Sequence, residues 1–394
     1  MKYKRVLFVS WDGPEVTYVE NLFTPIFLKL QENHGYEFHV IQFTSANKEI
    51  IKQRKKDLES RGIYFLGIPT FKRSALLGML KVKFLDIYQV KKYAENHGIE
   101  VLMPRAVNAY FIMKALFKNN KYRLVWDADG FPLEERVDFA GLSKDSIRYK
   151  FFKKMEHQAY YHAASLICRT QKAKEVITEN AGEGFDSDKV FVVPNGTFVL
   201  NESPPSVVKP KHLTLIYAGS LGPQYMLPEM LETFQFTKRT FTDARFKILT
   251  FHIEQAQDYI QQHFPHLLSG VEIKSVTAEK VKEELGKAHI GISFRKPSFS
   301  MQGVAPIKVV EYLSAGLPVI YNSGIGDMDD QLYGQGFAFC LDPKKDIYPS
   351  NLSFWIKEQM EQNSSTTVIQ FAAEHFSLKE SASLYHQALQ YGEG

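Results

Sequence analysis

The stretch that decides the fold lies at residues 300–320 and reads SMQGVAPIKVVEYLSAGLPVI. Its proline and glycine residues stand where they would mark the two ends of a helix. Pro306 suits the first helical turn, Gly316 the position just past the helix end, and Pro318 the opening of a following strand. The stretch therefore predicts a helix that passes directly into a β-strand.

The same alternation of strand and helix runs through most of the chain. Short apolar, β-branched runs alternate with amphipathic stretches, which indicates parallel sheets covered by helices on both faces, the doubly wound arrangement. The expected strands of a first domain are 6–10, 38–43, 101–103, 124–126, 166–168 and 190–193, and those of a second are 213–218, 246–250, 271–276, 290–294 and 318–321. The fold class is therefore α/β with two Rossmann-like domains.

Domain boundaries follow from a change in composition. The 394 residues, 44% hydrophobic and 23% charged, suffice for two ordinary cores. A polar, proline-rich stretch predicts a linker at 201–212 between a domain at 1–200 and a domain at 213–375. In the remaining segment, 376–394, the helix at 378–391 has one apolar stripe, which we expect to pack on the first domain.

Charge and cysteine content indicate which partners and which cellular compartment to expect. A net charge of +4 does not call for a nucleic-acid partner, and two cysteines in expected strands fit reduced thiols in a cytoplasm. No run of 18 apolar residues occurs, so only peripheral membrane attachment is expected. Residues 144–154 interleave basic and aromatic side chains, a composition that can rest on an anionic membrane. A solvated helix face with buried aromatics is the alternative.

Ligands of open parallel sheets bind beyond the carboxyl ends of the strands. Gly13 follows the first strand of the first domain, and Gly219 and Ser220 follow the first strand of the second. Glycine allows close approach of a ligand to the backbone, so we count these residues as ligand-binding candidates. An ordinary turn after each strand is the alternative.

The helix that begins at Pro306 carries the clearest candidate site. The amides of residues 303–307, which include those of Gly303, Val304 and Ala305, lack partners within a helix and favour a phosphate. Glu311 lies further along the same helix, where a carboxylate can accept hydrogen bonds from the two hydroxyls of a ribose. The alternative is an ordinary helix with an exposed glutamate.

At this point the residues resemble a known family. The pattern Pro306-x-Lys308-x-x-Glu311-Tyr312-x-x-Ala315-Gly316-x-Pro318-Val319-Ile320 is similar to the donor-site signature of GT4 retaining glycosyltransferases. Residues 193–198 (VPNGTF) and 217–221 (YAGSL) resemble the end of that family's first domain and the start of its second. Residues 126–137 (WDADGFPLEERV) resemble a segment of members that build bacterial capsules and exopolysaccharides.

The resemblance implies the GT-B fold, in which two Rossmann-like domains face each other across a cleft. It also implies that Glu311 binds the donor ribose, that amides near Val304 and Ala305 meet the phosphates, and that Val276 or its neighbours contact the base. The reaction would transfer a hexosyl residue with retention from a UDP- or GDP-sugar to a glycan or lipid-linked hydroxyl. No metal or other cofactor is expected.

Three departures from the family pattern bear on the donor site. Gly303 stands where the family has a sugar-contacting glutamate. The family's phosphate-binding arginine and lysine fall on Ser220 and Tyr225. The cations that usually hold the diphosphate are therefore absent from their places.

Other charged residues are candidates for the missing roles. Arg295 and Lys308 could stabilise the leaving diphosphate, with solvated surface charge as the alternative for each. Asp127 could contact the acceptor or the sugar, or cap a helix. Arg105 is an acceptor-side candidate that could instead pair with an acid.

The function expected from these residues is cytoplasmic glycosyl transfer in surface polysaccharide biosynthesis. A sugar-nucleotide epimerase or phosphorylase of the same fold is one alternative. A non-catalytic sugar-nucleotide-binding protein is the other, favoured by Gly303, Ser220 and Tyr225. No H-E-x-x-H or other metal-binding pattern occurs among the twelve histidines.

Overall fold

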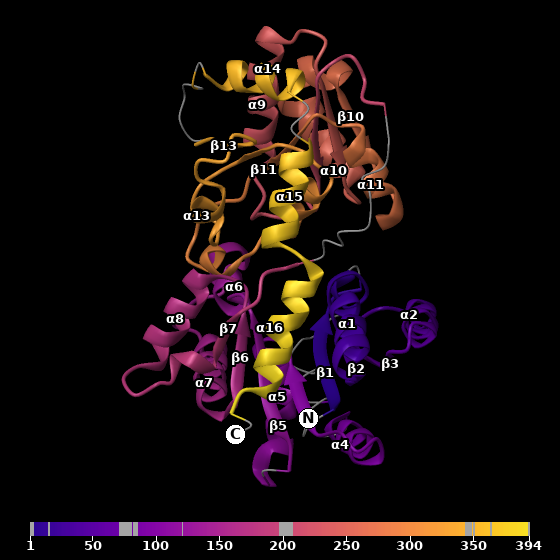
Figure 1. Cartoon of the computed structure of the whole chain (residues 1–394), viewed down its shortest axis with the longest axis vertical. Coiled ribbons are helices and arrows are strands. Elements are labelled where there is room, and N and C mark those ends of the chain that lie inside the picture. The colour runs from indigo at the N-terminus through magenta and orange to yellow at the C-terminus, as the bar shows by residue number, and fades with distance from the viewer. Residues whose placement is uncertain are drawn as a thin grey trace. The chain divides into compact units, whose positions relative to one another are not determined.

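A computed structural model describes residues 4–14, 16–70, 81, 86–119, 121–196, 208–342, 349, 351–362 and 365–392. The chain divides into two compact units (Figure 1). Unit 1 comprises Met1–Gly196 and Leu378–Gly394, and unit 2 comprises Thr197–Ser377. Most of the linker expected at 201–212 lies outside the described residues.

Unit 1 is built on a seven-stranded parallel sheet with the order β3-β2-β1-β4-β5-β6-β7. Its strands are β1 (Arg5–Asp12), β2 (Glu37–Thr44), β3 (Tyr64–Pro69), β4 (Val101–Pro104), β5 (Arg123–Asp129), β6 (Ser165–Cys168) and β7 (Val190–Val192). The order reverses at β1 and β4, which is the doubly wound Rossmann arrangement. The near-continuous burial of β1, β2, β4 and β6 follows from helices on both sheet faces.

Apart from the last, the helices of unit 1 lie between its strands along the chain. They are α1 (Thr24–His34), α2 (Lys48–Ser60), α4 (Ile87–Asn96), α5 (Ala106–Met113), α6 (Pro132–Ala140), α7 (Ile147–His162), α8 (Gln171–Ala181) and α16 (Leu378–Gln390), with a π-helical turn η1 (Val19–Phe23) before α1. The side chains of Asn47, Ser146 and Thr170 each accept a hydrogen bond from a first-turn amide of α2, α7 and α8.

Strand β3 is one that the sequence pattern did not predict. Gly67 and Pro69 lie within it, and both residues argue against a strand interior. The structure tolerates them because β3 is the edge strand, and a Cβ at Gly67 would lie 2.5 Å from Ile51 of the covering helix α2. Close helix packing therefore explains the glycine.

Unit 2 is built on a six-stranded parallel sheet with the order β10-β9-β8-β11-β12-β13. Its strands are β8 (Thr214–Ala218), β9 (Arg245–Leu249), β10 (Val271–Lys274), β11 (Ile290–Ser293), β12 (Val319–Tyr321) and β13 (Ala338–Cys340). Its helices are α9 (Leu227–Thr240), α10 (Ile253–His263), α11 (Ala278–Gly286), α12 (Ile307–Ser314), α13 (Met328–Leu332), α14 (Asn351–Glu361) and α15 (Ser365–His375). Both sheets confirm the predicted fold class.

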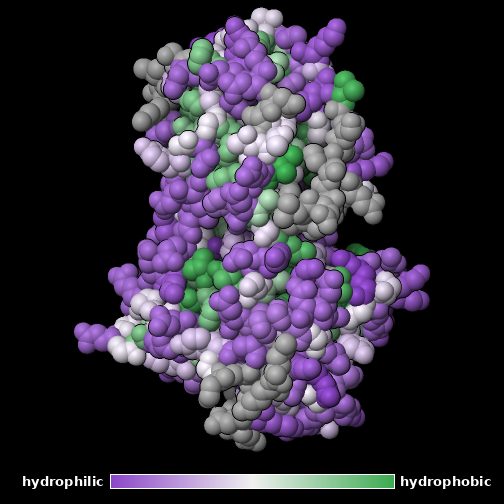
Figure 2. Space-filling model, viewed as in Figure 1, coloured by the Kyte–Doolittle hydropathy of each residue, from purple (hydrophilic) through white to green (hydrophobic). Residues whose placement is uncertain are grey.

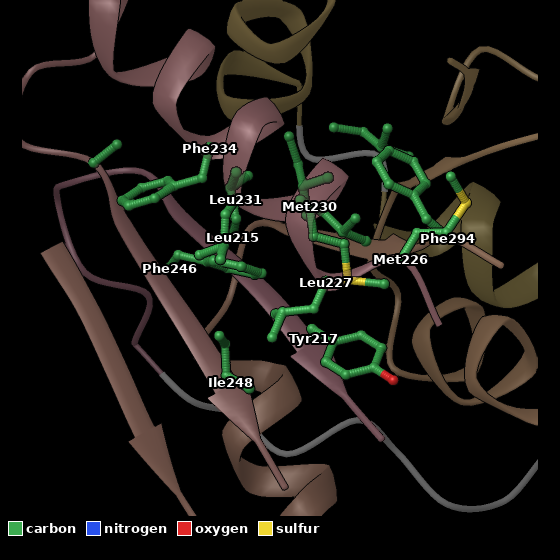
Figure 3. Packing of buried hydrophobic residues seen from close by; sticks show 14 of the residues in the cluster. Leu215, Tyr217, Met226, Leu227, Met230, Leu231, Phe234, Phe246, Ile248 and Phe294 are labelled. Atoms are coloured by element: carbon green, nitrogen blue, oxygen red, sulfur yellow. The ribbon is translucent and has the colours of Figure 1, made fainter. Parts of the chain in front are cut away.

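The core of unit 2 forms between β8, β9 and helix α9 (Figure 3). Phe234 and Leu231 of α9 pack against Phe246 of β9 with no exposed surface. Tyr217 stands at the margin of this cluster with its hydroxyl turned away from the apolar side chains (Figure 3). The Tyr217 hydroxyl is therefore a polar group at the edge of this core, near the carboxyl end of β8.

Helix α16 packs within unit 1, against α1, β6 and β7 (Figure 1). Its buried stripe includes Ala382, Tyr385 and Leu389. The Ser165 hydroxyl donates to the Ala388 carbonyl at 2.5 Å, and the Ser381 hydroxyl donates to the Pro194 carbonyl at 3.1 Å. The C-terminal helix is thus part of the first sheet's covering layer.

The surface is polar over most of the face shown in Figure 2, where hydrophobic residues gather only in separate patches. Among the described residues, no helix has both the length and the hydropathy that a membrane span requires.

Candidate functional site

The carboxyl edge of the unit 2 sheet gathers several of the predicted site residues. Gly219 and Ser220 follow β8, Arg295 follows β11, and Val276 follows β10. Because the strands are parallel, their carboxyl ends share one edge.

The loop after β8 takes its shape from tyrosines. The Tyr217 side chain folds over the loop and donates to the Ser220 carbonyl. A Cβ at residue 219 would lie 2.6 Å from the Tyr217 hydroxyl oxygen, so a larger residue there would displace the Tyr217 side chain. The Tyr312 hydroxyl accepts from the Ala218 N–H at 2.8 Å, which ties helix α12 to the end of β8.

His252 is a member of this edge that the sequence reasoning missed. It follows β9, and its Nε2 lies 3.4 Å from the Ser220 Oγ. Ser220 occupies the place of a family arginine, so an imidazole stands beside the position where that cation is absent. A lone histidine after a strand carries no motif, and only the sheet order brings it next to Ser220.

Arg295 is held against Tyr225, the residue in the place of the family lysine. The guanidinium carbon lies 4.8 Å from the centroid of the Tyr225 ring, and Nη2 lies 3.4 Å from its hydroxyl. The two residues also form an isolated antiparallel bridge. A cation–π contact of this kind keeps the guanidinium beside the loop after β8. Arg295 therefore places a positive charge beside Tyr225.

Glu311 and Lys308 form a pair on helix α12. The Lys308 Nζ donates to the Glu311 Oε2 at 2.8 Å, and both side chains are about one-third exposed (33% and 30%). Lys308 therefore neutralises the glutamate, while the Glu311 Oε1 can still accept from a hydroxyl. The Lys308 ammonium therefore contacts Glu311, which is not the phosphate contact predicted for it.

The amino end of α12 differs in detail from the prediction. Pro306 is the residue before the helix rather than its first residue, and no side chain caps the end. The Val304 N–H donates to the Met301 carbonyl at 3.2 Å within the turn η6 (Ser300–Gly303), so it is not an open amide as expected. The amides of Ile307 and Lys308 lie in the first turn, where no intrahelical acceptor exists. Of the residues predicted to offer amides, 303–307, Ile307 is therefore the one in the first helical turn, and Lys308 adjoins it.

The remaining donor-side candidates are placed less tightly. Gly303 is buried, and Ala305 and Val276 are half-buried. Gly316, with φ of +73°, ends the helix region as predicted.

A second charged group lies along the carboxyl edge of the unit 1 sheet. Arg105, after β4, donates to Asp12 Oδ1 at 2.9 Å and to Asp129 Oδ2 at 2.6 Å. Its guanidinium also lies 4.8 Å from the ring centroid of Tyr18. The pairing with acids, the alternative for Arg105, is what the structure shows. Gly13, beside Asp12, is exposed.

Asp127 is not a substrate-facing residue, which corrects the sequence prediction. Its side chain has no exposed surface, and both oxygens accept from Arg169 Nη2 at 2.7 and 2.6 Å. The Tyr385 hydroxyl of α16 donates to Oδ2 at 2.8 Å. Asp127 does not cap a helix either. Its side-chain partners lie 42 and 258 residues away, so no local pattern could have revealed them.

Asp129 is the carboxylate of this group that reaches the surface. Its side chain is 27% exposed, and it lies between Arg105 and Arg169. Burial by itself raises the pKa of Asp129, but the two guanidinium groups outweigh burial and lower the pKa below its ordinary value. The carboxylate therefore stays ionised at neutral pH and serves as a hydrogen-bond acceptor.

Two non-glycine residues of this edge adopt left-handed backbone conformations. Ala106 has φ of +59° and Asp129 has φ of +65°. Such conformations cost about 1–3 kcal/mol and cluster at functional sites. Both residues adjoin Arg105 or belong to its ion pairs, which marks this edge as a second candidate site.

Comparison with solved structures defines the fold class as GT-B, the two-domain architecture of many glycosyltransferases. No protein-family model and no curated protein matches the chain in sequence. The structure of Anabaena HepE with UDP and glucose aligns with a TM-score of 0.71 and 13% identity, covering 98% of this chain and 100% of that one. HepE is also known in complex with UDP-glucose.

Two further structures illustrate the range of activities on this fold. The lipopolysaccharide outer core galactosyltransferase WaaB aligns with a TM-score of 0.65 and 13% identity, covering 98% and 99% of the chains. A putative UDP-N-acetylglucosamine 2-epimerase from Listeria monocytogenes aligns with a TM-score of 0.60 and 14% identity, covering 99% and 96%. At these identities the likeness concerns the fold.

Proposed function

We propose that the chain is a retaining glycosyltransferase that moves a hexosyl residue from a nucleotide-diphosphate sugar to a hydroxyl of a glycan or lipid-linked oligosaccharide. The observation that carries the proposal is the grouping, at one sheet edge, of Arg295, the open end of α12 and the nucleotide-binding candidate Glu311. This grouping offers a cation, amides and a carboxylate to a diphosphate and a ribose.

The donor would be held by three groups of unit 2. The free Oε1 of Glu311 accepts from a ribose hydroxyl. The first-turn amides of Ile307 and Lys308, with the helix dipole, face the diphosphate charge. Arg295 completes the site in place of the family's missing cations. Gly303 carries no side chain for the sugar, so the hexose must find its hydrogen bonds elsewhere.

Transfer would proceed on one face of the sugar. The bond from the anomeric carbon to the diphosphate oxygen breaks, a bond to the acceptor oxygen forms on the same face, and the acceptor proton passes to a phosphate oxygen. Negative charge grows on the diphosphate as it leaves, and fixed cations and amides stabilise that charge most in the transition state. Arg295 and α12 supply these groups without a metal ion or other cofactor.

The acceptor side would be formed by unit 1, with Asp129 and Arg105 in place of Asp127. An ionised carboxylate flanked by arginines can accept from sugar hydroxyls while the guanidinium keeps it in place. Asp129→Asn should raise the acceptor KM and leave UDP affinity unchanged. Equal loss of both would assign the residue to folding instead.

We infer that the enzyme works in the cytoplasm at an anionic membrane surface. In α7, Ile147 is 88% exposed and Phe151 is 41% exposed, beside the remaining basic residues of 144–154. Lys153 does not join this surface, because it pairs with Glu134 and Glu156 at 2.7 Å each. Ile147→Asp should reduce co-sedimentation with phosphatidylglycerol vesicles, and unchanged co-sedimentation would refute the contact.

The resemblance of the signature around Glu311 to GT4 enzymes supports membership of that family. Similarity of residues 126–137 to capsule and exopolysaccharide enzymes supports a role in surface polysaccharide biosynthesis. The fold shared with HepE and WaaB is compatible with both assignments.

Epimerisation of a sugar nucleotide is the second candidate function, because the Listeria structure shares the fold. It differs from transfer in needing no acceptor. A protein that binds the nucleotide without turnover would show neither activity.

The proposal is tested by nucleotide binding followed by turnover. Calorimetry with UDP and GDP should show binding of one of them, and Glu311→Ala should weaken it about tenfold or more through loss of a charged hydrogen bond. Glu361→Ala serves as control, since Glu361 also faces a lysine on a unit 2 helix but lies 67% exposed. Unchanged affinity in a folded Glu311→Ala variant would refute the ribose assignment.

Turnover separates the candidate activities. Labelled UDP- and GDP-sugars are incubated with and without a panel of glycoside acceptors, and the products are assigned by NMR. Transfer with the anomeric configuration of the donor supports the proposal. An isomerised sugar without acceptor would assign epimerisation, and inverted product would exclude retention.

A further inference from the structure

Asn322 is a buried polar residue directly after strand β12. Its side chain belongs to a residue only 2% exposed, and the sequence reasoning assigned it no role. Strands β11 and β12 pair in parallel up to Ser293 and Tyr321. Asn322 thus stands just past the last pair of this ladder, next to the segment that carries Arg295.

The amide of Asn322 hydrogen-bonds the backbone of Arg295 in both directions. The Arg295 N–H donates to Asn322 Oδ1 at 2.8 Å, and Asn322 Nδ2 donates to the Arg295 carbonyl at 2.8 Å. Nδ2 also donates to the Ser323 carbonyl at 3.0 Å. The side chain therefore acts as a peptide group that extends the sheet by one more pairing.

The opposite side of the same segment is held by the loop after β8. Arg295 forms an antiparallel bridge with Tyr225, and the Lys296 N–H donates to the Gln224 carbonyl at 2.9 Å. The Arg295 backbone is thus fixed on both sides, and its guanidinium rests on the Tyr225 ring. A cation fixed in this way need not reorganise when charge develops on a leaving group.

Only an amide satisfies this arrangement. It presents one acceptor and one donor on a short planar group, whereas an aspartate would offer only acceptors and would place one beside the Arg295 carbonyl. An aliphatic residue would leave a buried N–H and a buried carbonyl without partners. The residue type at 322 therefore follows from the need to hold Arg295.

We propose that Asn322 is a positioning residue that fixes Arg295 for contact with the donor diphosphate. The inference rests on the proposed function and deepens it, because it names how the chain compensates for Ser220 and Tyr225. Arg295 would touch the diphosphate, and Asn322 would act through it.

The test compares nucleotides with and without phosphates. Affinities for UDP and uridine, and for GDP and guanosine, are measured by calorimetry in the wild type, Asn322→Asp and the surface control Asn351→Asp. Asn322→Asp should weaken diphosphate binding about tenfold and leave nucleoside binding unchanged. Equal loss for nucleoside and diphosphate would overturn the proposal, because it would indicate a general structural role.

A double-mutant cycle makes the link to Arg295 explicit. In an Arg295→Ala background, Asn322→Asp should cause no further loss of diphosphate affinity. Additive losses would overturn the proposal. Asn322→Ser, which keeps a smaller donor and acceptor, should give a weaker loss in the same direction if the aspartate variant does not fold.

The same experiment separates this inference from the proposed function. A wild type that binds neither diphosphate would overturn both. A wild type that binds a diphosphate, together with an Asn322→Asp variant that binds it equally well, would overturn only the positioning role.

Discussion

The hydroxyl of Tyr385 offers the sharpest test of how unit 1 is held together. It donates to Asp127 Oδ2 at 2.8 Å and accepts from Arg169 Nη1 at 3.0 Å. All three residues are buried, and the most exposed of them, Arg169, is 4% exposed. Tyr385→Phe removes this group and leaves the ring in place. The two buried charges would each lose a partner that water cannot replace.

The magnitude follows from the contacts that are lost and those that remain. A hydrogen bond to a charged group contributes about 1.5–3 kcal/mol, and two are removed here. Asp127 still keeps Arg169 and the Asp129 N–H at 3.0 Å, so the losses should not add fully. We expect the free energy of unfolding of unit 1 to fall by about 2–4 kcal/mol.

The assay needs a signal from unit 1 alone. Of the three tryptophans, Trp11 and Trp126 lie in unit 1 and Trp355 in unit 2. In a Trp355→Phe background, urea unfolding followed by tryptophan fluorescence therefore reports unit 1. With m near 3 kcal/mol per molar urea for a unit of this size, the midpoint should fall by about 1 M.

Tyr391→Phe provides a matched control. Tyr391 also donates to an aspartate, Asp186, at 2.7 Å, but this contact lies at the surface. Its loss should leave the midpoint unchanged. If Tyr385→Phe shifts the midpoint no more than Tyr391→Phe does, the reasoning about the buried network is wrong.

Two further predictions concern unit 2. Gly291→Ala should lower its free energy of unfolding by about 1–3 kcal/mol, since the added Cβ would lie 2.4 Å from the Tyr312 ring. Gly336→Ala, with open space around it, should have little effect. Both are measured by urea unfolding followed through Trp355, in a background that lacks Trp11 and Trp126. Unit 2 should also lose stability as pH falls from about 6.5 to about 4. Burial chiefly lowers the pKa of His289 to about 4, so in this window the unfolded chain takes up a proton that the folded chain does not. His289→Asn keeps an acceptor for the Thr214 N–H, from which His289 Nδ1 accepts a hydrogen bond at 3.1 Å, and should flatten this part of the pH profile. An unchanged profile would show that other groups cause the loss of stability.

The chain's electrostatics explain why one aspartate was mistaken for another. Asp127 and Asp129 stand two residues apart, and both lie at the carboxyl end of strand β5. Alternation along β5 does not decide between them. The choice depends on Arg169 and Tyr385, which enclose Asp127, and on the left-handed backbone at Asp129, which brings the second carboxylate to the surface.

Local sequence determined the two sheets, most of their strands and the helix that carries Glu311. These features depend on the spacing of apolar residues and on proline and glycine at element ends, which act over a few residues. The sequence pattern did not predict the edge strand β3, because a glycine and a proline interrupt its run of apolar residues.

Tertiary structure alone decided how the charges are paired. The contacts of Arg295 with Tyr225 and Asn322, and of Asp127 with Arg169 and Tyr385, arise from the order of strands and the return of α16. A charged residue looks the same in sequence whether solvent or a buried partner surrounds it, because desolvation and pairing depend on atoms brought from distant parts of the chain. For this protein the sequence therefore predicted a nucleotide site at one sheet edge, and the fold showed how the charged side chains there are paired.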